Sequence, residues 1–164
     1  MEVKFLKKML VYPTLRNWSN KGTSLEEIEF LEKKYNNGNL FPQAFREYLY
    51  IAGKHSNLGD IDIGFGYEWM QEKAREELND CGKNIDRPFF VVSQLDACTQ
   101  FSFIYLDDNS EDPFKYNCFC HESYWDESSF IEVSPSGRFS FFINVCVDRA
   151  IIDDDFINGL TSKD

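Results

Sequence analysis

The hydrophobic residues between positions 24 and 53 follow the period of two short amphipathic helices. We expect the first over residues 24–36, with one face that buries Leu25, Ile28, Leu31 and Tyr35. After a polar turn at 36–39, we expect the second over 42–52, with a buried face formed by Phe45, Tyr48, Leu49 and Ala52. Helices this short need tertiary packing to persist, so the pair predicts a helical layer within a larger fold.

Local signals mark where these two helices start and stop. Ser24 and Glu27 have the spacing of a capping box, in which the hydroxyl accepts from the Glu27 amide and the carboxylate reaches back. Pro42 suits the first turn of the second helix because its missing N–H has no partner there. Gly53 is expected to end that helix.

Residues 1–22 are expected to form an N-terminal extension. Residues 1–12 fit a short helix or a strand, and we favour the helix because Phe5, Met9 and Tyr12 lie at helical spacing before Pro13. Residues 17–23 are rich in Asn, Ser, Lys and Gly, which predicts a loop before the capped helix.

The segment after the two helices contains one stretch with the period of a strand and one with the period of a helix. Residues 58–65 contain a polar–apolar alternation at 60–63, which predicts a short strand, and Gly64-Phe65-Gly66 predicts a turn. A charged helix is expected over 68–81, with Trp69, Lys73, Ala74 and Leu78 on one face and Gly82 at its end.

From residue 88 the chain becomes rich in aromatic and β-branched residues separated by polar breaks. Strands are expected at 89–92, 101–106 and 114–119, joined by connections of hairpin length, so the pattern predicts a three-stranded antiparallel meander. Residues 139–147 fit both a strand and a helix. The length of the segment from 137 to 152, with Ser136 as a possible N-cap, favours a helix, followed by a polar tail at 153–164.

These elements predict the α+β class, with an antiparallel β-sheet packed with several α-helices. The chain has 164 residues, 43% of them hydrophobic and 16% aromatic, which argues against intrinsic disorder and for one domain over 1–164. Five cysteines without repeated spacing indicate reduced thiols. No apolar run has the length of a signal peptide or a membrane span, so we expect a soluble, cytoplasmic protein.

The charge balance narrows the class of partner. The chain holds 17 basic and 28 acidic residues, a formal charge of −11 with a pI near 4.6. A surface of this sign repels a phosphate backbone, so we expect no nucleic-acid ligand. Residues 1–22 hold five basic residues and one acidic residue, so the acidity belongs to the main body.

Few residues offer catalytic or metal-binding chemistry. The run Cys118-Phe119-Cys120-His121, with Cys81 or Cys98 as a fourth ligand, is a hypothetical zinc site. Strand alternation opposes it by placing Cys118 and Cys120 on one face and His121 on the other, and the same geometry opposes a nucleophilic Cys120 activated by His121. Nucleotide, calcium and hydrolase motifs are incomplete or absent from the sequence, so we expect no enzyme and no cofactor.

Two acidic segments have the composition of an interface. The first comprises Asp107, Asp108, Glu111 and Asp112, and the second interleaves aromatic and acidic residues as Glu122, Tyr124, Trp125, Asp126 and Glu127. Charge runs often only solubilise a loop. The alternative is an acidic docking face with an aromatic anchor, since aromatic residues supply much binding energy and charges steer the encounter.

The order of motifs resembles the SUKH superfamily. The first match is an acidic helix ending in Tyr35, then Phe41-Pro42, then Phe45-Arg46-Glu47-Tyr48-Leu49 and Gly53; the second comprises Asp96 to Ile104 and Asp112-Pro113-Phe114-Lys115-Tyr116. Together they lie within residues 24–152. Phe41 stands where relatives usually have Leu, and Ala97-Cys98 stands where they often have a His-containing turn.

The resemblance implies an α+β binding scaffold without shared catalytic residues. Bacterial members look like immunity proteins that block a cognate toxin, often a nuclease or deaminase, and fungal relatives regulate cell-wall synthesis. We therefore expect a cytoplasmic immunity protein that binds a basic toxin through the segments at 107–112 and 122–127. The alternatives are a regulatory adaptor on the same scaffold and a metal or thiol enzyme.

Overall fold

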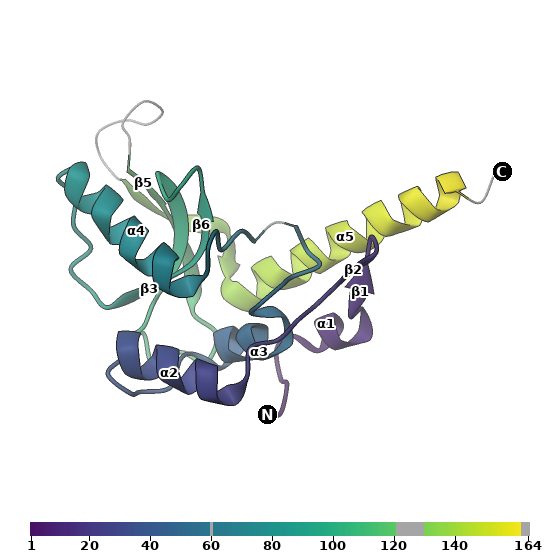
Figure 1. The fold of residues 1–164 in the computed structure, drawn as a ribbon, viewed down its shortest axis with the longest axis horizontal. Helices are drawn as coiled ribbons and strands as arrows, with labels where there is room; N and C mark the ends of the chain where they lie inside the picture. The colour runs from purple at the N-terminus through teal and green to yellow at the C-terminus, as the bar shows by residue number, and fades with distance from the viewer. Residues whose placement is uncertain (60, 121–129, 162–164) are drawn as a thin grey trace. The chain divides into compact units, whose positions relative to one another are not determined.

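A computed structural model of the chain describes residues 1–59, 61–120 and 130–161 and confirms the α+β class. Figure 1 shows its elements in chain order. These are α1 (Lys7–Val11), β1 (Thr14–Leu15), β2 (Trp18–Ser19), α2 (Leu25–Tyr35), α3 (Gln43–Ala52), α4 (Tyr67–Asp80), β3 (Phe89–Leu95), β4 (Gln100–Tyr105), β5 (Phe114–Phe119), β6 (Ile131–Arg138) and α5 (Phe139–Thr161).

The fold divides into two compact units. The helical unit comprises residues 1–60 and 140–164, and the sheet unit comprises residues 61–139. The expectation of one domain over 1–164 stays a prediction. Within residues 1–59, 61–120 and 130–161, no helix combines the length and apolar character needed to cross a bilayer.

In the helical unit, the predicted start of α2 and the buried face of α3 are confirmed. Glu27 N donates to Ser24 Oγ over 3.3 Å, and Ser24 N donates to Glu27 Oε2 over 2.9 Å, which completes the capping box. Helix α3 buries all four residues expected of it, Phe45, Tyr48, Leu49 and Ala52.

Two details of these helices differ from expectation. Leu25 is 40% exposed, because the buried face of α2 is formed by Ile28, Leu31 and the carboxylate-bearing Glu32. Pro42 is the N-cap of α3 and not a residue of its first turn. Gly53 does end α3, but in helical geometry; a Cβ there would lie 2.3 Å from Thr23 Oγ1, so close packing requires the glycine.

The N-terminal extension belongs to the helical unit. The short helix predicted there is confirmed as α1, but the predicted loop at 17–23 contains β2, which pairs with β1 in a tight hairpin. Arg16 and Asn17 form its turn with φ of 53° and 63°, the left-handed geometry that suits a two-residue hairpin turn. Strands of two residues are too short to show a periodicity, so the pattern does not reveal them.

The C-terminal helix is confirmed, but both of its ends are wrong in the prediction. Ser136 lies in strand β6 and is not an N-cap, since β6 runs directly into α5 at Phe139. Helix α5 continues to Thr161, so residues 153–161 are helical where a polar tail was expected. Asp154 accepts a hydrogen bond from Arg16 N over 2.6 Å, which ties this part of α5 to the β1–β2 turn.

The sheet unit is an antiparallel meander in the order β3-β4-β5-β6. Its first three strands match the prediction, whereas β6 was missed because its sequence is rich in Ser, Pro and Gly. Helix α4 packs against β3, and its end at Gly82 is confirmed: Gly82 has φ of 65°, and Lys83 N donates to Leu78 O over 2.8 Å. No strand forms at residues 61–65, where the backbone makes a turn instead.

Candidate functional site

The first predicted acidic segment lies on the β4–β5 connection, residues 106–113, which we call the acidic loop. Arg87 donates to Asp107 Oδ1 from Nη2 over 2.6 Å and to Oδ2 from Nε over 3.1 Å, and it also pairs with Asp108. The guanidinium carbon lies 3.8 Å from the centre of the Tyr105 ring. Asp107 and Asp108 are therefore already paired with a cation that lies just before β3.

A second arginine closes the other side of the acidic loop. Arg138 Nη1 donates to the backbone oxygen of Asp112 over 2.7 Å and to Ser110 Oγ over 3.2 Å, above the Phe114 ring. Glu111 is exposed. Arg87 lies 20 residues before Asp107 in the sequence, so the sequence does not show that it offsets part of the negative charge of this loop.

The second predicted segment, Glu122, Tyr124, Trp125, Asp126 and Glu127, lies outside the described residues. The strand ends that flank it are described, and Phe119 N donates to Phe130 O over 2.9 Å. Gln100 pairs with Phe119 and Phe103 with Tyr116, so these strand ends lie at the opposite end of the sheet from the acidic loop. The acidic loop and the strand ends next to residues 121–129 are therefore separated by the length of β4 and β5.

The Arg87 contact makes the acidic loop sensitive to pH. The guanidinium of Arg87 lowers the pKa of Asp107 below the ordinary aspartate value of about 3.9, because it donates two hydrogen bonds to the carboxylate. A depressed carboxyl pKa stabilises the fold above the ordinary pKa, and this contribution disappears as the pH falls through the folded pKa.

Replacing Arg87 with alanine is therefore expected to raise the pKa of Asp107 toward its ordinary value. The pair is exposed, so the loss of unfolding free energy at neutral pH should stay at or below about 1 kcal/mol and vanish in strong acid. A carboxyl-detected NMR titration of both proteins measures the midpoint of Asp107. An unchanged midpoint would contradict the assigned contact.

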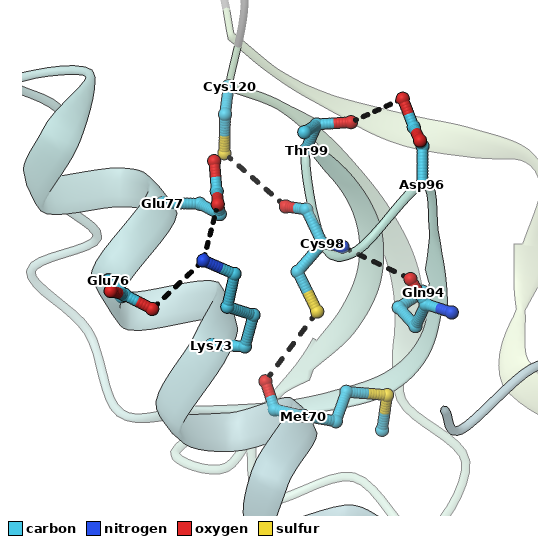
Figure 2. Close-up of polar contacts among 9 residues, drawn as sticks. All are labelled: Met70, Lys73, Glu76, Glu77, Gln94, Asp96, Cys98, Thr99 and Cys120. Atoms are coloured by element: carbon cyan, nitrogen blue, oxygen red, sulfur yellow. Dashed lines mark hydrogen bonds and ion pairs between the residues drawn. The ribbon is translucent and has the colours of Figure 1, made fainter. Parts of the chain in front are cut away.

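The predicted zinc and thiol chemistry centres on a cysteine cluster in the sheet unit, shown in part in Figure 2. Cys98, Cys118 and Cys120 are buried, with at most 1% of each exposed. Cys98 Sγ contacts Met70 O over 3.9 Å, and Cys120 Sγ contacts Cys98 O over 3.8 Å. The burial of both Cys118 and Cys120 agrees with the prediction that they share one face of the strand, and a hydrogen bond joins the two thiols.

The turn that carries Cys98 has an unusual backbone. Asp96, Ala97 and Cys98 have φ of 51°, 51° and 68°, three consecutive left-handed residues without a glycine. Cys98 N donates to Gln94 Oε1 over 3.1 Å, and Thr99 N donates to Asp96 O over 3.1 Å. These hydrogen bonds hold the turn, and Figure 2 shows the Cys98 side chain directed toward α4.

The electrostatics of the cluster differ from one thiol to the next. Burial raises the pKa of Cys98 to about 11, and the hydrogen bond to Cys120 together with burial raises that of Cys118. The same hydrogen bond lowers the pKa of Cys120, but burial opposes this change. The cations that lower these pKa values are themselves paired: Lys73, near Cys98, lies 2.8 Å from Glu77 Oε1 and 2.9 Å from Glu76 Oε2, and Lys83 donates to the backbone oxygen of Cys120 over 2.9 Å.

These thiols do not form a metal centre within the described part of the chain. Among those residues, no three His, Cys, Asp or Glu side chains are grouped so as to hold a metal ion. His121 lies outside the described residues. Within the described residues, the hypothesis of a metal or thiol enzyme therefore rests on buried cysteine thiols alone.

Alkylation of the native protein with iodoacetamide is expected to modify Cys81 first, because all five cysteines lie in the described part of the chain and, among them, Cys81 alone has a partly exposed side chain. The other four, Cys98, Cys118, Cys120 and Cys146, are buried and should react only after unfolding. Mass spectrometry of peptides from native and denatured samples locates the label. Rapid modification of native Cys120 would instead support the thiol-enzyme hypothesis.

An exposed aromatic turn at residues 62–69 was not among the predicted sites. Phe65 is 90% exposed and contacts the ring of Trp69 edge-on, with ring centres 5.2 Å apart. Gly64 has φ of 58°, and a Cβ there would lie 2.2 Å from Trp69 Cζ3, so the backbone passes directly against that ring. The sequence feature that could have indicated this exposure is a phenylalanine between two glycines, because neither neighbour has a side chain to cover the ring.

The acidic charge is concentrated in the sheet unit. Residues 61–139 contain 16 acidic and 6 basic residues, a formal charge of −10, whereas the remaining residues contain 12 and 11, a formal charge of −1. The helical unit is therefore nearly neutral, whereas the sheet unit is strongly acidic. The acidic loop and the aromatic turn both belong to the acidic one.

Comparison with protein-family models, with curated proteins and with solved structures finds no match.

Proposed function

We propose that this chain is a cytoplasmic immunity protein that binds and neutralises a cognate protein toxin with a basic surface, of the nuclease or deaminase kind. The observation that carries this proposal is the formal charge of −10 on the sheet unit, against −1 on the helical unit. The proposed contact surface includes the acidic loop residues Asp107, Asp108, Glu111 and Asp112.

The charge matches the chemistry of such a toxin. An enzyme that acts on nucleic acid holds phosphates with clustered Lys and Arg, and an acidic protein unit attracts the same cations. Electrostatic steering of this kind raises association rates to about 10⁸–10⁹ M⁻¹s⁻¹ at low salt. A protein that covers the cationic site blocks the toxin without breaking any bond, so the proposed function needs no catalytic group in this chain.

The resemblance to the SUKH superfamily supports the same proposal. The resembling helices also have clear structural roles in this chain. Arg46 Nε lies 2.7 Å from Glu32 Oε1, and Glu32 Oε1 accepts from Phe41 N over 2.7 Å, so the charged residues of the motif join α2 to the start of α3. Glu47 binds the N-terminal segment. Glu32, Arg46 and Glu47 of the resembling motif therefore stabilise the fold, and we expect the partner to bind exposed residues elsewhere.

Expression of the reading frame beside this one tests the proposal. We expect its product to arrest growth and this chain to restore growth when both are expressed. We also expect the two proteins to co-purify, with weaker association when Asp107, Asp108, Glu111 and Asp112 are replaced by Asn or Gln. A neighbouring product that is harmless, or a toxin that this chain neither binds nor blocks, would overturn the proposal. Resident cellular proteins as the stable partners would favour the regulatory adaptor.

A further inference from the structure

The aromatic turn presents an apolar side chain that the described part of the sheet unit leaves uncovered. Phe65 is 90% exposed, and the nearby β3–β4 hairpin contributes a second exposed apolar residue, Leu95, at 61%. Isolated apolar residues on a surface are ordinary, but a nearly uncovered phenylalanine held on a built turn is not. The turn therefore has the composition of an interface anchor, since aromatic residues dominate binding hot spots.

The turn is held in one conformation by contacts with the rest of the sheet unit. Asp62 Oδ1 accepts from Gly64 N over 2.7 Å, and Asp62 O accepts from Gln94 N over 2.8 Å. Asp62 also accepts from the Gln94 side chain. With the Trp69 ring against Gly64, these bonds fix the position from which Phe65 projects. A fixed anchor loses less conformational entropy on binding than a mobile one.

The charge around the turn selects the class of partner. Residues 61–72 and 93–99 contain four acidic residues, Asp62, Glu68, Glu72 and Asp96, and no Lys or Arg. All four are exposed. A partner segment that covers Phe65 must therefore bring its flanking residues into a region of negative potential, which favours Lys and Arg and opposes Asp and Glu.

We infer that the aromatic turn is a docking site for a cationic protein segment that covers Phe65 with an apolar side chain or pocket and places Lys or Arg beside Asp62, Glu68, Glu72 and Asp96. This inference deepens the proposed function, because it names the anchor through which the sheet unit holds its partner. It does not depend on the acidic loop, which lies at the far end of the sheet from the β3–β4 hairpin.

Selection of random displayed peptides against the native full-length protein tests the inference separately from the growth assay. We expect enriched peptides to combine an apolar residue with Lys or Arg. Their affinity should fall at least about 30-fold for Phe65→Ser, because a hot-spot aromatic contributes at least that factor. The matched control is Phe30→Ser, a change at a 52% exposed phenylalanine of α2 in the helical unit, which should leave the affinity unchanged.

Each other outcome would overturn the docking site. Enriched peptides that bind Phe65→Ser as tightly as the wild type, peptides rich in Asp and Glu, or a selection without enrichment all contradict it. Phe65 is exposed, so Phe65→Ser should fold, and amide NMR spectra of both variants verify this. If this chain rescues growth but peptide binding is unaffected by Phe65→Ser, the aromatic turn is rejected as the docking site and the proposed function stands. If rescue fails but peptide binding depends on Phe65, the docking site stands and the proposed function is rejected.

Discussion

Replacement of Glu47 with alanine is expected to lower the free energy of unfolding by about 3–5 kcal/mol, a large part of the stability of an ordinary domain. Glu47 is completely buried in α3. Its carboxylate accepts from Lys4 N over 2.7 Å, Phe5 N over 2.8 Å and Leu6 N over 2.9 Å. These N–H groups precede α1, where no helical carbonyl is available to them.

The size of this loss in unfolding free energy follows from the backbone N–H groups that Glu47→Ala leaves without their acceptor. Without Glu47, three backbone donors lose a charged acceptor, and each hydrogen bond to a charged group contributes about 1.5–3 kcal/mol. Water that enters the cavity should recover part of the loss. The N-terminal segment should then detach, which hydrogen exchange at Phe5 and Leu6 measures directly.

Chemical denaturation of Glu47→Ala gives the stability change, and Glu29→Ala provides the matched control. Glu29 is an exposed glutamate of α2, so its replacement should change the free energy of unfolding by no more than about 0.5 kcal/mol. Equal effects of the two substitutions would show that residues 4–6 do not depend on the Glu47 carboxylate.

Replacement of Gln71 with alanine is expected to cost about 2–4 kcal/mol, because two buried backbone groups of β3 lose their partners. Gln71 Nε2 donates to Val91 O over 2.8 Å, and Val91 N donates to Gln71 Oε1 over 2.8 Å. Strand β3 is at the edge of the sheet, and the register shifts between Val91 and Ser93. The side-chain amide thus pairs with Val91 in place of a neighbouring strand.

The readout that isolates this role is hydrogen exchange at Val91. In Gln71→Ala, the Val91 amide should exchange much faster than the amides of β4, in addition to the loss in unfolding free energy. Glu72→Ala, an exposed change on the same helix, should leave Val91 protected. Unchanged protection of Val91 in Gln71→Ala would contradict the assigned pairing.

Features encoded by neighbouring residues could be predicted, and features that depend on distant contacts could not. The capping box of Ser24 and Glu27 and the glycine stop at Gly82 are local, and both were correct. The buried roles of Glu32, Glu47 and Gln71 depend on contacts with Phe41, residues 4–6 and Val91. A charged or amide residue on a helix is expected to face solvent unless its distant partner is known.

The same distinction applies to the candidate site. The acidic composition of residues 107–112 was evident, but the pairing of Asp107 and Asp108 with Arg87 was not, because the two segments meet only when β3 and β4 pair. Strand alternation correctly placed Cys118 and Cys120 on one face. The turn at Gly64-Phe65-Gly66 could be predicted, but the exposure of Phe65 could not, because a phenylalanine is ordinarily expected in the core.

Whether the acidic sheet unit captures a cationic toxin is decided by the rate at which this chain associates with the purified product of the neighbouring reading frame as salt is increased. We expect this rate to fall steeply with salt, and to be at least about tenfold slower at low salt when Asp107, Asp108, Glu111 and Asp112 are neutralised. Neutralising four exposed carboxylates of the helical unit, Glu2, Glu26, Glu29 and Asp155, should change the rate by no more than about twofold. A rate that is independent of salt, or that falls equally for both variants, would contradict capture by the acidic sheet unit.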